Sequence, residues 1–103
     1  MAGLTITEFE WMAPTGPNRD GIAQIPMQPP VTVQTALVPG ASSAQSQAFN
    51  AATRFVELTT DADCRINFGS NPTAAQSNSL MKAGDVRYYG VRAGDKLAVI
   101  ANV

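Results

Sequence analysis

Few side chains in this sequence could carry out catalysis. Histidine is absent, which removes the commonest general base and the commonest neutral metal ligand, together with every Ser-His-Asp and Cys-His arrangement. The single cysteine, Cys64, lies in an alternating apolar run over residues 64–68, which predicts a small buried hydrophobe rather than a nucleophile. Ser77, Ser79 and Lys82 lie close in sequence, but no oxyanion hole or substrate pocket accompanies them. We therefore expect no catalytic residues and no enzymatic activity.

Asp61 and Asp63 resemble the start of a calcium-binding loop. An EF-hand loop beginning there would next need an oxygen ligand, a glycine and a terminal glutamate, whereas the chain has Arg65, Ile66 and Pro72 at those positions. The two aspartates therefore predict an Asp-rich β-turn, and no metal is expected. The glycines form neither a P-loop nor a Rossmann fingerprint, so no cofactor is expected either.

The elements that carry these residues are predicted to be short β-strands. Apolar and polar residues alternate with period two in four runs of the second half: Thr53–Thr60, Cys64–Phe68, Val86–Val91 and Lys96–Ile100. Turn residues separate these runs at a spacing of about ten residues, which is typical of sandwiches and barrels. The similar sequences of 82–86 and 92–96 predict two similar turns flanking one strand. Tyr88 and Tyr89 should point to opposite faces of that strand.

The first half differs because it is rich in proline and poor in charge. Six of the seven prolines lie within the first 39 residues, and proline is excluded from continuous helix and from central strands. Two strand-like pieces remain in this half, Leu4–Trp11 and Val31–Val38, and the second would place Val31, Val33, Thr35 and Leu37 on one face. Residues 40–47 are expected to be a polar linker or exposed loop, and 74–81 could hold one helical turn.

These patterns together predict an all-β protein. Its expected form is a small β-sandwich or jelly-roll-like domain over residues 48–103, preceded over residues 1–47 by an extended Pro-rich N-terminal arm with a polar linker. Large apolar side chains in such an arm have few ways to be buried by the arm itself, and extended segments can add a strand to an exposed sheet edge. The expected partner-binding residues are Phe9, Trp11, Met12, Met27, Val31, Val33 and Leu37. The alternative is that this segment closes the domain's own core.

Composition excludes several classes of protein. Of the 103 residues, 45% are hydrophobic and only 15% charged, and seven basic against eight acidic side chains leave a net charge of −1. A direct nucleic-acid binder would normally show a basic excess, so none is expected. No apolar run approaches the length of a membrane span, and residues 1–10 lack the basic and apolar regions of a signal peptide. The expectation is a product of a reducing cytoplasm with no membrane partner.

The second half of the chain resembles a family of viral proteins. The segments 53–58, 63–74, 88–91 and 94–100, with their Gly-Ser-Asn-Pro-Thr turn and Gly-Asp-Lys ending, resemble small structural proteins of tailed bacteriophages. Within that group, the closest role is that of a capsid decoration or cement protein. The resemblance implies a β-rich, oligomeric protein that binds where capsid subunits meet and needs no active site.

The expected function is therefore that of a non-enzymatic virion protein made in the host bacterial cytoplasm. It would stabilise the capsid surface at junctions of the major capsid protein and would act as a homotrimer, since a closed cyclic oligomer matches a threefold capsid axis. Two alternatives remain open. One is a head–tail connector, neck or tail component, and the other is a small β-sandwich carbohydrate-binding module that uses Trp11 with Tyr88 or Tyr89.

Overall fold

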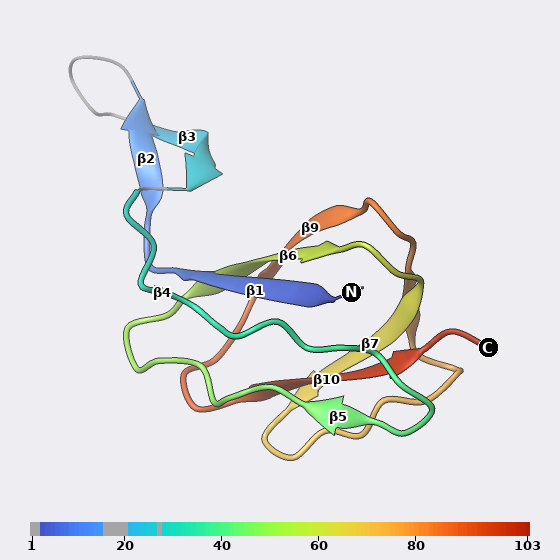
Figure 1. Ribbon diagram of the computed structural model, residues 1–103. Coiled ribbons are helices and arrows are strands. Elements are labelled where there is room, and N and C mark those ends of the chain that lie inside the picture. Colours follow the sequence, from blue (N-terminus) through green and yellow to red (C-terminus); the bar gives the residue numbers. More distant parts are fainter. Residues whose placement is uncertain (1–2, 16–20, 27) are drawn as a thin grey trace.

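The chain folds into β-strands that form two sheets and a hairpin (Figure 1). The computed structural model describes residues 3–15, 21–26 and 28–103, without the side chains of 12–15 and 21–26. The described residues contain no helix. The strands are β1 (Leu4–Phe9), β2 (Met12–Thr15), β3 (Gly21–Pro26), β4 (Thr32–Val33), β5 (Ala44–Gln45), β6 (Phe55–Thr60), β7 (Cys64–Gly69), β8 (Ser79–Met81), β9 (Val86–Gly90) and β10 (Lys96–Ala101).

Two antiparallel four-stranded sheets make up the body of the protein. The first sheet has the order β4-β1-β6-β9, and the second has the order β5-β10-β7-β8. From β4 onward, the chain passes from one sheet to the other at every connection except that between β7 and β8. This is the all-β, sandwich-like architecture that the strand pattern predicts.

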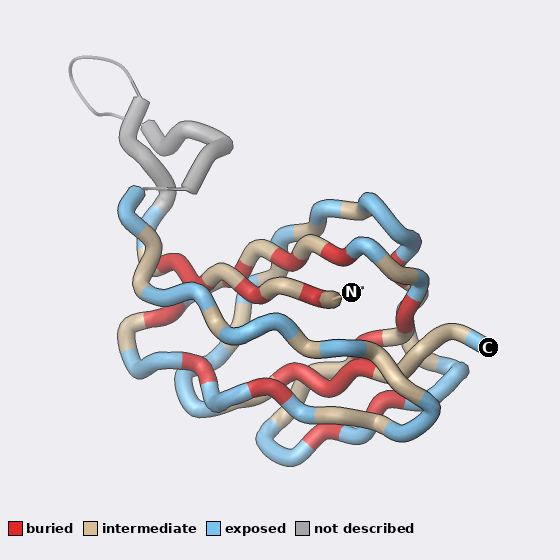
Figure 2. Tube along the Cα trace, in the orientation of Figure 1, coloured by how far each residue is buried: buried red, intermediate tan, exposed pale blue. Residues whose placement is uncertain are grey.

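The core forms where the inner faces of the two sheets meet. Buried and partly buried residues alternate along β1 and β6 (Figure 2), because successive side chains of a strand point to opposite faces. The first sheet contributes Leu4, Ile6, Val56 and Leu58, and the second contributes Cys64, Ile66, Met81, Leu97 and Val99. Phe49, from the loop before β6, closes one end.

A buried carboxylate ties this loop to β1. Glu8 is almost fully buried, and its carboxylate oxygens accept hydrogen bonds from Gln34 Nε2 at 2.8 Å, Asn50 N at 2.8 Å and Thr53 Oγ1 at 2.6 Å. Buried charges are tolerated when hydrogen bonds replace their hydration. Glu8 therefore holds three segments together that are far apart in sequence.

The hairpin of β2 and β3 projects from one end of the sandwich (Figure 1). The molecule measures 49 × 26 × 23 Å, and its radius of gyration is 14.3 Å, compared with about 12.8 Å for a compact chain of this length. Within the described part of the chain, each hairpin strand pairs only with the other. The hairpin is thus an appendage of the sandwich.

The two expected turns on either side of β9 are confirmed. Asp85 N donates to Lys82 O at 2.9 Å, and Asp95 N donates to Arg92 O at 3.2 Å. Gly84 and Gly94 occupy the third turn position with φ of 90° and 85°, a conformation that favours glycine. Local backbone chemistry therefore dictates both turns.

The expected Pro-rich arm over residues 1–47 is not confirmed, and its first strand lies inside the sandwich. β1 is flanked by β4 and β6, with Leu4 opposite Thr60 and Phe9 opposite Phe55. The prolines that argue against a central strand begin only at Pro14, and 4–9 has its own alternation. β1 is therefore an inner strand of the first sheet.

The structure corrects three local expectations. Residues 31–38 run along β1, where Gln34 N donates to Ile6 O and Leu37 pairs with Leu4, but only Thr32–Val33 forms a strand. Val33 is exposed whereas Leu37 packs against the core, so the two do not share a face. The expected linker 40–47 contains β5, which pairs with β10. Residues 74–81 contain one hydrogen-bonded turn, with Asn78 N donating to Ala75 O at 3.0 Å, and then β8 rather than a helix. Pairing with distant strands decides the structure in each case.

Candidate functional site

The outer face of the second sheet is covered by the chain itself. Residues 70–78, here called the strap, follow β7 and are hydrogen-bonded to side chains of this face. Asn67 Nδ2 donates to Thr73 O at 3.1 Å, and Gln45 Nε2 donates to Pro72 O at 2.8 Å. Arg65 Nη1 donates to Asn78 O at 3.1 Å. Polar side chains of the sheet therefore hold the backbone of the strap.

The strap buries the middle of this outer face. Ala98 points outward from β10, in the position opposite Gln45 and Asn67, yet it has no exposed surface. Ala74 and Pro72 of the strap are buried as well. The outer face of the second sheet is consequently part of the folded interior and offers little surface to a partner.

The outer face of the first sheet contrasts with it and is here called the open face. Its side chains point away from the core on β4, β1, β6 and β9: Val33, Thr5, Thr7, Phe9, Phe55, Glu57, Thr59, Val86 and Tyr88. Val33 and Val86 are each 56% exposed and Tyr88 is 49% exposed. These exposed apolar side chains lie on the two edge strands of the face, and apolar groups exposed on one face are typical of interaction sites.

The open face carries a single charged side chain. Tyr88 Oη donates a 2.5 Å hydrogen bond to Glu57 Oε2, and this bond, with a smaller contribution from burial, raises the pKa of Tyr88. Phe9 and Phe55 stack at one end of the face, with ring centroids 5.3 Å apart and planes inclined by 16°. A flat β surface of threonine, valine and aromatic groups suits protein contact, because little charge has to be desolvated.

The expected partner-binding residues do not form one surface. Phe9 is only 2% exposed and packs on Phe55, and Leu37 packs against the core. Trp11, 61% exposed, lies at the base of the hairpin. Val31 is partly buried, and Val33 lies on the open face. Met12 lies in β2, where side chains are not described, and Met27 lies outside the described residues.

Sequence reasoning missed the residues that β6 and β9 contribute to the open face. The separation of Tyr88 and Tyr89 onto opposite faces is confirmed, because Tyr89 packs against the core and Phe68 while Tyr88 is exposed. Val86 lies two residues before Tyr88 on the same face of β9, and Glu57 lies opposite Tyr88 on β6. Only the pairing of β9 with β6 and β1 shows that these positions form one continuous surface.

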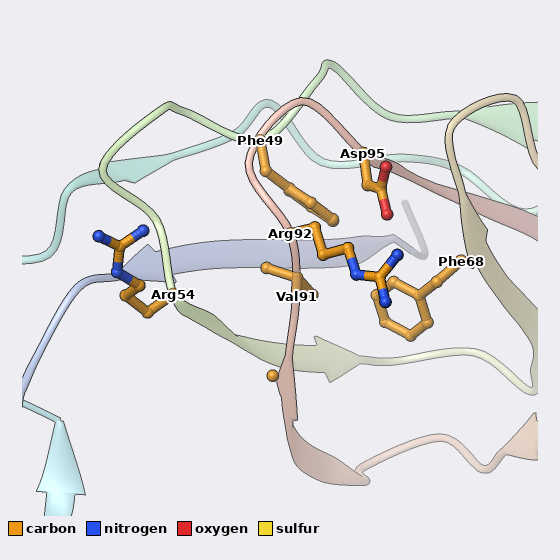
Figure 3. A pocket seen from close by; sticks show the side chains of 7 residues that line it. Phe49, Arg54, Phe68, Val91, Arg92 and Asp95 are labelled. Carbon is orange, nitrogen blue, oxygen red and sulfur yellow. The ribbon is translucent and has the colours of Figure 1, made fainter.

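A cavity of about 320 Å³ lies at the hairpin end of the sandwich (Figure 3). Phe49, Phe68 and Val91 provide apolar walls, with Arg92 and Asp95 beside them. The Arg54 side chain points away from that of Arg92 (Figure 3), so the two guanidinium groups do not converge on one anion. The lining contains no hydroxyl, thiol or amine nucleophile, and nothing in it indicates a reaction.

The aspartates after β6 have structural partners. Asp61 accepts a hydrogen bond from Gly3 N, and Asp63 accepts one from Ala83 N at 2.9 Å and lies 4.0 Å from Lys82 Nζ. The chain bends at Asp61 and Ala62 between β6 and β7, which gives the change of direction but not the β-turn that the sequence predicts. Over the described ranges, no group of three or more His, Cys, Asp or Glu residues is placed to hold a metal ion.

Cys64 is expected to be unreactive in the folded protein. Its side chain has no exposed surface, and burial is the main cause that raises the pKa of its thiol, so both access and thiolate content are reduced. Treatment with a thiol reagent at neutral pH should modify Cys64 only after a denaturant is added. Stoichiometric modification of the native protein within minutes would contradict this placement.

Comparisons with protein-family models, curated proteins and solved structures found no match. The described part of the chain also contains no helix long and apolar enough to cross a membrane.

Proposed function

We propose that this chain is a non-enzymatic structural protein of a tailed-phage particle that stabilises the capsid shell as a decoration protein. The observation that carries the proposal is the asymmetry of the two sheets. One outer face is covered by the strap, whereas the other exposes Val33, Val86 and Tyr88 with Glu57 as its only charge. Such a face is suited to docking on a flat protein surface.

The proposed mechanism is adhesive. The open face lies on the outer surface of the major capsid protein where subunits meet, and self-association of the decoration protein, most simply as a trimer, matches the local axis. Burying the exposed apolar groups of one copy contributes about 25 cal/mol of binding free energy for each Å² removed from water, before the entropic cost of ordering side chains is subtracted. Repetition around the shell multiplies this local contact through multivalency.

The strand order supports a jelly-roll assignment within the same proposal. From β4 to β10, the strands are assigned to the two sheets in the same sequence as the strands of a jelly roll. β1 lies between β4 and β6, where the last strand of a jelly roll would lie. Jelly rolls recur in viral capsid and lectin domains. The fold class is therefore compatible with a role on a capsid.

The abundance of the chain in purified particles tests the proposal. A decoration protein should be present in copy numbers that scale with the number of capsid subunits, as measured by quantitative mass spectrometry of purified virions. A few copies per particle would instead support the head–tail connector, neck or tail alternative. Absence from the particles would contradict the whole proposal.

A lysine on the open face should weaken binding to shells. Val33→Lys places a charge at the edge of the face farthest from β9, and we expect its affinity for undecorated shells to fall about tenfold or more, which is about 1.4 kcal/mol. Ala75→Lys on the strap is the matched control, because Ala75 is exposed on the opposite side of the sandwich. Equal binding by the two variants, measured by co-sedimentation with shells, would show that docking does not use the open face.

A further inference from the structure

Three of the four sheet edges are short, whereas β9 is a full strand. β4 and β5 contain two residues each, and β8 contains three. β9 forms the edge of the first sheet with five residues, and it contains neither proline nor lysine. Natural proteins blunt exposed edges with short strands, prolines or lysines, so the β9 edge lacks protection that the other edges have.

The free backbone groups of β9 can be identified from its pairing. Val91 N donates to Arg54 O at 3.0 Å, and the direction of backbone groups alternates along an antiparallel strand. Val86, Tyr88 and Gly90 therefore present their N–H and C=O groups on the side away from β6. The Arg87 guanidinium is directed to Leu80 O, at 2.7 Å on β8, so its charge does not block this edge.

The projecting hairpin also has an unpaired strand edge. β2 and β3 pair only with each other among the described strands, and an isolated two-stranded hairpin is at best marginally stable in water. β3 has six residues and no charged side chain, whereas β2 carries Pro14 in its interior, which lacks a backbone donor. A third strand would therefore be added on the β3 side.

We infer that β3 of one copy adds to the β9 edge of a neighbouring copy of the same chain. The two strands are of nearly equal length, and the pairing satisfies the free edge of each. Because the two surfaces differ, the contact is heterologous, and repetition around a rotation axis closes a ring. The inference rests on the self-association in the proposed function and is independent of capsid binding.

Sedimentation velocity of matched variants tests the pairing. Val86→Lys and Val33→Lys alter two valines of equal exposure on the two opposite edges of the same sheet. We expect the unmodified protein to form a closed oligomer at micromolar concentration, Val86→Lys to weaken association about tenfold or more, and Val33→Lys to leave it unchanged. A monomeric unmodified protein, or equal association by both variants, would overturn the inference. Because association is measured without shells, a failure of the proposed pairing is distinguished from a failure of shell binding, which Val33→Lys tests separately.

Disulfide trapping identifies the neighbouring strand. Tyr88→Cys combined with Gln24→Cys should yield cross-linked species up to the size of the closed ring on oxidation, whereas Val33→Cys with Gln24→Cys should not. Cross-linking of Tyr88→Cys alone into a dimer would show pairing of β9 with β9 about a twofold axis, which would overturn the inference. An unchanged melting temperature for each variant confirms that it is folded.

Discussion

Removal of residues 1–9 should leave the remaining chain unfolded. These residues include β1, which lies between β4 and β6 and contributes Leu4 and Ile6 to the core. Burial of the two side chains alone contributes about 3–6 kcal/mol, while a domain of this size has a total stability of about 5–15 kcal/mol. Loss of the strand also exposes the backbone of β6. Circular dichroism of the truncated protein should show no cooperative thermal transition.

Excision of the hairpin is the matched control for this truncation. Replacing residues 12–26 with a short glycine-serine linker removes more residues, but it removes strands that pair only with each other in the described structure. The sandwich should still unfold cooperatively, and self-association should be lost because β3 is absent. A folded 1–9 truncation, or an unfolded hairpin excision, would show that the assignment of these segments to core and appendage is wrong.

Replacement of Glu8 by alanine should cause the largest loss of stability of any single substitution of a polar residue. The change leaves Gln34 Nε2, Asn50 N and Thr53 Oγ1 without their acceptor, and each unsatisfied buried donor costs about 1–3 kcal/mol. Water can reach the donors nearer the surface, so we expect a total loss of about 3 kcal/mol in the free energy of unfolding. Urea denaturation measures this change directly.

Two further variants separate the hydrogen-bond network from charge. Glu8→Gln keeps the shape and one acceptor oxygen, but it turns an amide N–H₂ toward donors, so we expect an intermediate loss of about 2 kcal/mol. Glu10→Gln removes the same charge two residues away and should change stability by less than about 0.5 kcal/mol. Equal stability of Glu8→Ala and Glu10→Gln would show that the Glu8 contacts are dispensable.

The N-terminal half shows why overall composition does not decide whether a segment joins a sheet. Proline content is an average over 39 residues, whereas the ability to join a sheet depends on each short segment. Leu4–Phe9 contains no proline and alternates as β6 does, so the local signal for a strand was present. What the sequence lacked was any indication of the partner, because β1 pairs with strands that begin 28 and 51 residues after its own first residue.

The candidate site on the open face could also be predicted only in part from the sequence. Alternation predicted that Tyr88 and Tyr89 would point to opposite faces. Phe9, Trp11 and Val33 were expected to bind a partner because they are large apolar groups in a proline-rich, charge-poor half. Burial then depended on what lies opposite each residue. Phe9 meets Phe55, Trp11 meets solvent, and Val33 lies on the side of its sheet that has no strap.

The sequence by itself determined the features that depend on neighbouring residues. These are the strands β6, β7, β9 and β10, the two turns with Gly84 and Gly94, and the burial of Cys64, because period-two alternation and positive φ are local properties. Only the tertiary structure decided that β1 lies within the sheet, that Glu8 is buried, and that one outer face is covered while the other is open. These features arise from contacts between residues far apart in sequence, and no local pattern records which distant segment supplies the contact.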